Sequence, residues 1–184
     1  MLFLVAAALA AVPVPTPAEL AVLNSGQVVL RDAVPTLPNG VAMLGIVDIQ
    51  APESAIWAAL VDMEGRMAGN SSLRAVEIYQ PATANEMWYR FEAGRFGMTV
   101  VYHNHYVVDR ARRTLLHELD PTRPNDLRAS RGLFELAPLA DGFRLAYAVE
   151  TDFGRSIPSF VVEWMSGSGV RTFLEDIAAR SERR

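Results

Sequence analysis

The chain of 184 residues contains neither cysteine nor lysine. Without cysteine it has no thiol nucleophile, disulfide, thiolate zinc site or lipid-modified cysteine. All 17 basic residues are arginine, which also excludes Schiff-base catalysis and the lysine of a phosphate-binding P-loop. Several common mechanisms are therefore excluded before any motif is considered.

Positive charge is scarce as well, because 21 acidic residues outnumber the arginines and the net charge is -4. The arginines are scattered along the chain, whereas a phosphate backbone is bound by clustered positive charge. We therefore expect no nucleic acid partner. No apolar run is long enough to span a membrane, so we expect no transmembrane segment, although transient membrane contact stays open.

The N-terminus begins with an apolar run, Leu2–Val12, that is followed by prolines. Its length and the small residues after it are typical of a signal peptide, with cleavage after Ala10 or, less favourably, Ala18. We interpret residues 1–18 as a signal peptide and spacer of an exported, periplasmic or secreted protein. No basic residue precedes the run, which is atypical, so a start further upstream or a packed or disordered arm are alternatives.

The remainder, residues 19–184, is predicted to form one monomeric α+β domain, since 51% of the chain is hydrophobic. Pro52 begins a predicted helix with Ile56, Trp57 and Leu60 on one face, and a second short helix follows it. Alternating patterns predict strands between turns. The predicted strands are a short one within 25–32, then 41–50, 73–80, 86–93, 98–108, 114–120, 133–137 and 143–153.

Turn positions predict which strand residues face one another. We place turns at 94–97, 109–112 and 140–143. The resulting pairs are Phe91 with Val100, Tyr89 with Tyr102, Met87 with Asn104, Tyr106 with Leu115, Asn104 with His117, Leu136 with Tyr147, and Phe134 with Val149. All three hairpins give one apolar, aromatic face. The opposite face carries Arg90, Glu118, Glu135, Arg144 and Glu150.

The last predicted element is a long helix over 154–180 that small residues interrupt at 166–169, with the sequence SGSG. Its apolar stripe is formed by Ile157, Phe160, Val161 and Trp164 before the interruption, and by Val170, Phe173, Leu174 and Ile177 after it. The second part is rotated by about a third of a turn. Each interior glycine costs about 1 kcal/mol relative to alanine. Either a kink or close backbone packing explains the glycines, or they leave room for a ligand between helix and sheet.

Three stretches together resemble the START-like (SRPBCC) superfamily, which includes the polyketide cyclase/dehydrase and lipid transport group. They are "APESAIWAALVDMEG", "RGLFELAPLADGFRLAYAVETD" and "IPSFVVEW". The resemblance covers roughly residues 41–179. It implies a helix-grip fold, in which a curved antiparallel sheet wraps around a long C-terminal helix and leaves an apolar cavity between them. Because the superfamily is functionally broad, the resemblance implies a hydrophobic ligand without naming it.

Register and resemblance together predict the residues that line this cavity. The predicted ligand-binding residues are Met87, Tyr89, Phe91, Val100, Tyr102, Asn104, His117, Phe134, Leu136, Tyr147, Phe160, Trp164 and Gly167. Among them Asn104 and His117 are buried polar groups that need partners. Either they satisfy each other, or they orient a polar group of the ligand. No cofactor is predicted.

The stretch "YHNHY" is the most enzyme-like part of the sequence. His103 and His105 are two residues apart on a strand and point the same way, as metal-binding pairs do. The register turns them away from the cavity and places Glu86 opposite His105. This arrangement is more typical of an ordinary cross-strand pair than of a metal site, so no metal is predicted.

These observations leave three functional hypotheses. The first is a carrier that encloses a lipid, isoprenoid, sterol-like or polyketide-like molecule. The alternative is a cyclase or isomerase in which His117 is the general acid/base and Asn104 or a tyrosine is the orienting donor. A filled interior would instead indicate an interaction module. A strongly perturbed His117 facing an open cavity would favour the enzyme.

Overall fold

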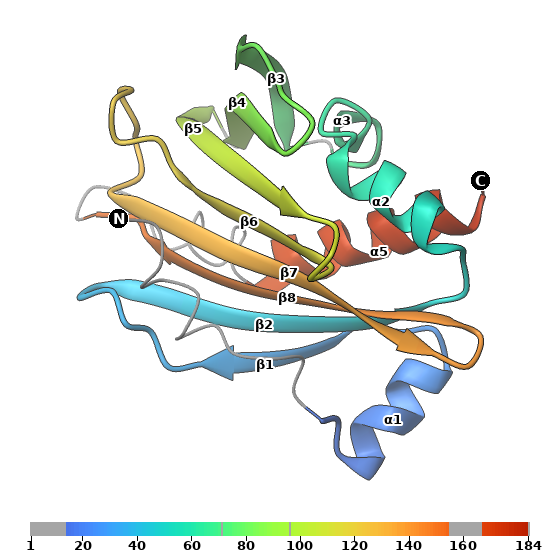
Figure 1. Ribbon diagram of the computed structural model, residues 1–184. Coiled ribbons are helices and arrows are strands. Elements are labelled where there is room, and N and C mark those ends of the chain that lie inside the picture. Colours follow the sequence, from blue (N-terminus) through green and yellow to red (C-terminus); the bar gives the residue numbers. More distant parts are fainter. Residues whose placement is uncertain (1–13, 71, 96, 155–166, 184) are drawn as a thin grey trace.

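The computed structural model describes residues 14–70, 72–95, 97–154 and 167–183. They form an antiparallel sheet of eight strands in the order β1-β2-β8-β7-β6-β5-β4-β3, which curves around a C-terminal helix (Figure 1). The strands are β1 (Val29–Ala33), β2 (Gly40–Ile49), β3 (Leu73–Gln80), β4 (Glu86–Arg95), β5 (Met98–Asp109), β6 (Thr114–Leu119), β7 (Ala129–Leu139) and β8 (Gly142–Asp152). The helices are α1 (Pro17–Asn24), α2 (Glu53–Val61), α3 (Arg66–Gly69) and α5 (Gly169–Glu182). The predicted α+β helix-grip fold is confirmed, and no described helix is long and apolar enough to cross a membrane.

The predicted residue pairs were wrong by two positions in every hairpin. Phe91 lies opposite Tyr102, Tyr106 opposite His117, and Phe134 opposite Tyr147. The turns have other bounds than expected: two residues join β4 to β5 and β7 to β8, and the β5–β6 loop is 110–113. Because side chains alternate with a period of two, a shift of two leaves every residue on its predicted face.

Helix α1 was missed, and it includes the end of the predicted spacer. The Thr16 hydroxyl accepts a hydrogen bond from the Glu19 backbone N–H, and the Glu19 carboxylate accepts one from the Thr16 backbone N–H, so the two form a capping box. Leu23 of this helix packs with Val29 and Ile46 on the outer face of β1 and β2. Most of the predicted signal peptide, residues 1–13, lies outside the described residues.

The predicted C-terminal helix is only partly described. Gly154 has a φ of +70°, which is incompatible with a helix starting there, and α5 begins at Gly169. Residues 155–166 lie outside the described residues, and with them Phe160 and Trp164. The prediction of an interrupted stripe is therefore tested only in its second half, where Val170, Leu174 and Ile177 are buried.

Helix α5 packs closely against β2 and α2. A Cβ atom added to Gly45 of β2 would lie 2.4 Å from Leu174 Cδ1 and 2.9 Å from Val170 Cγ1, so only glycine allows this approach. Leu174 and Ile177 are completely buried in the same cluster as Leu60 of α2. This part of the interior is tightly filled core.

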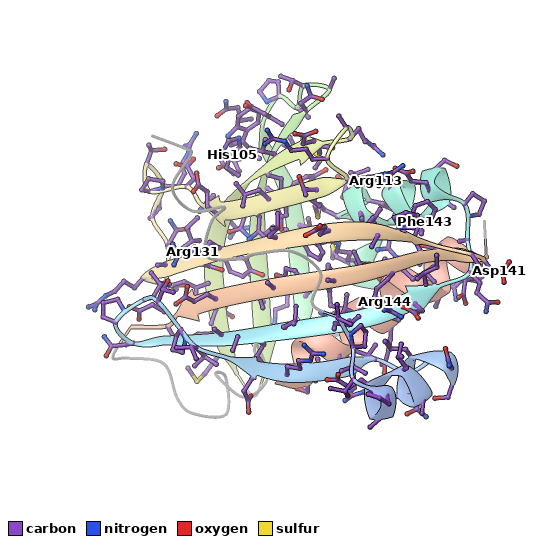
Figure 2. The ribbon with its side chains drawn as sticks, turned by 60° about the horizontal axis from the view of Figure 1, so that its bottom comes forward. His105, Arg113, Arg131, Asp141, Phe143 and Arg144 are labelled. Atoms are coloured by element: carbon purple, nitrogen blue, oxygen red, sulfur yellow. The ribbon has the colours of Figure 1, made fainter. Side chains whose placement is uncertain are left out.

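The outer face of the sheet carries charged residues, as predicted (Figure 2). Arg144 pairs with Asp48, and Arg131 with Glu150, at 2.7 and 2.8 Å. Glu150 is buried, and its carboxylate also accepts hydrogen bonds from the backbone N–H groups of Thr36 and Leu37, which compensate for the lost contact with water. Burial raises the pKa of Glu150, but these hydrogen bonds outweigh it and hold the pKa below its ordinary value. Glu150 therefore fastens the loop between β1 and β2 to the sheet.

Candidate functional site

A cavity of about 140 Å³ lies between the inner face of the sheet and the first turns of α5. Aromatic and aliphatic side chains form the larger part of its lining, which also includes several polar side chains and the hydroxyl groups of three tyrosines. The lining residues are Arg66, Asn70, Leu73, Phe91, Ala93, Tyr102, Asn104, Tyr106, His117, Leu127, Ser130, Phe134, Tyr147, Val149, Thr151, Gly169, Val170 and Phe173. Mostly apolar walls with a few placed polar groups are typical of small-molecule sites.

Six of the predicted ligand-binding residues line this cavity: Phe91, Tyr102, Asn104, His117, Phe134 and Tyr147. Met87, Tyr89 and Leu136 face inward but belong to the buried cluster that includes α2. Val100 packs in a separate cluster with Leu127 and Phe153. The inner face is longer than the cavity, and α2 covers part of it. A contact of the six residues with ligand remains a prediction.

The prediction omitted the polar residues that α3 and the ends of β7 and β8 contribute. Arg66 comes from α3, while Ser130 and Thr151 pair at 3.2 Å between β7 and β8. The alternation of apolar residues predicts which strand residues face inward. No pattern in the sequence distinguishes Arg66 from the other arginines. Tyr106, Val149, Val170 and Phe173 had been assigned to inward-facing stripes, so their inward position was expected.

His117 and Tyr147 form the central polar contact of the cavity. His117 Nε2 lies 2.8 Å from the Tyr147 hydroxyl, and the imidazole is only 4% exposed. Burial, followed by the nearby positive charge of Arg66, lowers the pKa of His117 to about 3. Burial also raises the pKa of Tyr147 well above its ordinary value. Both groups are therefore neutral at physiological pH.

Gly132 of β7 makes room for this contact. A Cβ atom there would lie 2.3 Å from His117 Nε2, 2.9 Å from Tyr147 Cε2 and 3.0 Å from the carbonyl oxygen of Ala148. Gly132 lies opposite His117 on β6 and between β6 and β8 in the sheet. Any side chain at this position would separate the imidazole from the phenol.

Arg66 is buried at the cavity, beside the hydroxyl group of Tyr106. It is 6% exposed, its Nη2 donates to the carbonyl oxygen of Leu60 at 2.6 Å, and its guanidinium lies 4.3 Å from the ring centre of Phe173. Its Nε has no hydrogen-bond partner in the described part of the protein. Burial lowers the pKa of Arg66, although arginine remains charged in proteins.

Asn104 and His117 do not pair with each other, contrary to one of the two alternatives. They lie on the adjacent strands β5 and β6, but Asn104 is opposite Leu119 and His117 is opposite Tyr106. Asn104 Nδ2 lies 3.4 Å from the Tyr106 hydroxyl, a long hydrogen bond. Asn104 Oδ1 and His117 Nδ1 have no partner among the described protein groups. The cavity thus presents unused hydrogen-bonding capacity on two strands and α3.

The two outer histidines have structural contacts. His103 Nδ1 lies 3.1 Å from the carbonyl oxygen of Pro124, and its ring packs edge-on against Tyr79. Trp88, and not Glu86 as predicted, lies opposite His105, and the two rings stack. The Glu86 carboxylate lies 3.8 Å from His105 Nε2. The described residues contain no group of three metal-ligating side chains.

Of the helix glycines, Gly169 lines the cavity and Gly167 does not. A Cβ atom at Gly167 would meet Met43 Sδ at 3.9 Å, an ordinary contact. Gly167 was predicted to bind ligand, but its place beside Met43 indicates a position next to the core cluster. Gly169 is therefore the helix glycine that borders the cavity.

Replacing Gly169 by leucine is expected to weaken binding of an apolar probe about 10-fold or more, because the new side chain occupies cavity space. The fold should survive, since leucine favours a helix over glycine by somewhat under 1 kcal/mol. Fluorescence titration and thermal melting measure the two effects. Unchanged affinity with a clearly lower melting temperature would instead assign Gly169 to tight packing, where overfilling costs about 1–3 kcal/mol.

Comparisons with known proteins support the same architecture. No protein-family model and no curated protein matches the sequence. The structure is similar to a STAR-related lipid transfer protein from Xanthomonas axonopodis, with a TM-score of 0.71 and 18% identity over 85% of this chain and 94% of that one. It is also similar to the Zhui aromatase/cyclase from Streptomyces sp. R1128, with a TM-score of 0.63 and 18% identity over 79% and 95% of the two chains. Human StAR-related lipid transfer protein 5 gives a TM-score of 0.62 and 16% identity over 85% and 81%.

At these identities the likeness establishes the fold alone. The fold is START-like, in agreement with the expectation from the three sequence stretches. Because both a lipid transfer protein and a cyclase share it, the choice between carrier and enzyme depends on this chain's own cavity.

Proposed function

We propose that this protein is a carrier that binds a hydrophobic small molecule between its sheet and α5. The supporting observation is the cavity, whose walls combine stacked aromatic and aliphatic side chains with several polar groups. A filled interior would have supported an interaction module instead. We propose a lipid, isoprenoid, sterol-like or polyketide-like ligand, bound by a monomer that contacts membranes only transiently.

The alternative is a cyclase or isomerase with His117 as general acid/base. The observation that favours it is the perturbed imidazole at the cavity, hydrogen-bonded to Tyr147. The direction of the shift argues against it, because a general base acts best with a pKa near the working pH. With a pKa of about 3, His117 is a weak base and holds no proton to donate as imidazolium.

Two measurements test the carrier. Fluorescence titration with N-phenyl-1-naphthylamine, an uncharged apolar probe, should show enhanced emission and saturable binding at micromolar concentrations. Mass spectrometry of an organic extract from natively purified protein should then identify the bound molecule. Failure of the probe to bind, together with an empty extract, would contradict the proposal. Chemical conversion of the extracted molecule by the purified protein would favour the enzyme.

We also propose that the protein is exported and loses its N-terminal apolar segment. The capping box favours cleavage after Ala10 over Ala18, because the latter would remove Thr16 and release Glu19 from the cap. Glu19 also binds Arg31 of β1 at 2.6 Å. N-terminal sequencing of protein from the host tests this, and full-length protein in the cytosol would contradict it.

A further inference from the structure

We infer that the ligand is an apolar acid whose anionic oxygen binds at Arg66. This inference rests on the proposed function, since it specifies the chemistry of a molecule held in the same cavity. It depends on the charge of Arg66, on the neutrality of its surroundings, and on the unused donors beside it.

Arg66 differs from the other well-buried arginines because it has no carboxylate partner among the described residues. Three half-buried or buried arginines each have a carboxylate partner: Arg131 with Glu150, Arg144 with Asp48, and Arg180 with Asp62 and Asp176. Arg66 is at least as buried, yet no carboxylate of the described residues forms an ion pair with it. A buried charge is normally paired because its desolvation is otherwise uncompensated.

The described groups around Arg66 do not neutralise it. Burial raises the pKa values of Tyr102, Tyr106 and Tyr147, so these phenols keep their protons. His117 is neutral as well. The contact with Phe173 and the carbonyl oxygen of Leu60 place the guanidinium without balancing its charge. Among the described lining residues Arg66 is thus a positive site in neutral and largely apolar surroundings, which selects a ligand with one negative group.

The unpartnered polar atoms can also serve such a ligand. Arg66 Nε is a donor, and a carboxylate binds arginine best through two of its N–H groups. If the Tyr147 hydroxyl donates to His117 Nε2, the imidazole proton lies on Nδ1, which is then a second donor. Turning the Asn104 amide lets its oxygen accept from Tyr106 and frees the amino group as a third donor. All three residues line the cavity.

The test uses two probes of the same shape, 2-naphthoate and 2-acetylnaphthalene, in which a carboxylate replaces an uncharged methyl ketone. Isothermal titration calorimetry at neutral pH should show that the intact protein binds 2-naphthoate about 10- to 100-fold more tightly, as expected for hydrogen bonds to a buried charge. Equal affinities, or tighter binding of the ketone, would overturn the inference and leave the carrier proposal standing. Binding of neither probe would overturn both.

Variants locate the effect. Arg66→Met keeps much of the side chain's apolar length, and it should bind the two probes with equal affinity. Arg171→Met removes the same charge from the outside of α5, where Arg171 donates to the carbonyl oxygen of Val28, and should keep the full preference. A preference retained by Arg66→Met would assign the anion to another site and overturn the inference. If Arg66→Met does not fold, the comparison of the two probes on the wild-type protein still decides.

Discussion

Replacing Gly132 by alanine is expected to lower the free energy of unfolding by about 2–5 kcal/mol. The added methyl group would collide with His117 Nε2 and with the Ala148 carbonyl oxygen, which belongs to the backbone of the neighbouring strand and cannot simply rotate away. Overfilling a packed site costs about 1–3 kcal/mol, and separating His117 from Tyr147 leaves buried polar groups unsatisfied at a similar cost. Thermal melting should show a decrease of roughly 5–15 °C.

Gly167→Ala is the matched control for this substitution. Among the described residues its new methyl group meets Met43 alone, at an ordinary distance, and alanine favours a helix over glycine. It should therefore melt at or slightly above the wild-type temperature. A Gly132→Ala protein that melts within about 2 °C of wild type would show that the sheet yields easily there, and that the His117–Tyr147 contact does not depend on glycine.

Replacing Glu150 by alanine is expected to lower the free energy of unfolding by about 2–4 kcal/mol. The substitution removes the carboxylate that accepts hydrogen bonds from Thr36, Leu37 and Arg131, and it leaves the Arg131 guanidinium without its carboxylate partner. Losing one member of a buried pair costs about 3–5 kcal/mol, and the partial exposure of Arg131 reduces this value. Glu77→Ala is the control, because Glu77 is 62% exposed and its pair with Arg90 should contribute less than about 1 kcal/mol.

The same carboxylate gives a pH dependence of definite sign. Because folding lowers the pKa of Glu150, its contribution is complete above the ordinary glutamate pKa of about 4.3 and is lost as the pH falls through the lower folded value. The stability difference between wild type and Glu150→Gln should therefore be constant near neutral pH and shrink under acid conditions. Denaturant unfolding at several pH values measures it. A difference that grows on acidification would contradict the assignment.

The sequence could predict the two faces of the sheet but not the exact pairing of its strands. Turn residues locate a hairpin to within a residue at each end, and an error of one residue on both strands shifts each partner by two. Phe91, His117 and Phe134 therefore face inward in the predicted and in the observed pairing. The alternation of polar and apolar residues, which determines the face, does not depend on the turn.

Residues whose role depends on several strands meeting could not be predicted. Gly132 belongs to a stretch that resembles the START-like superfamily, yet its importance follows from the positions of His117 and Tyr147 on two other strands. Arg66 lies on a helix of four residues, and only the folded chain shows that it is buried with no ion-pair partner among the described residues. Helix α1, by contrast, had a readable signal in Thr16, Pro17 and Glu19.

The two ends of helix α5 have different surroundings. Gly169, Val170 and Phe173 line the cavity, whereas Leu174 and Ile177, one and four residues further along, are sealed in the core against α2. Substitutions in the first turns can thus alter the lining of the cavity, while the later turns continue to pack against β2 and α2. The lining of the cavity and the core can therefore vary separately, which agrees with backbones that still superimpose when fewer than one residue in five is shared.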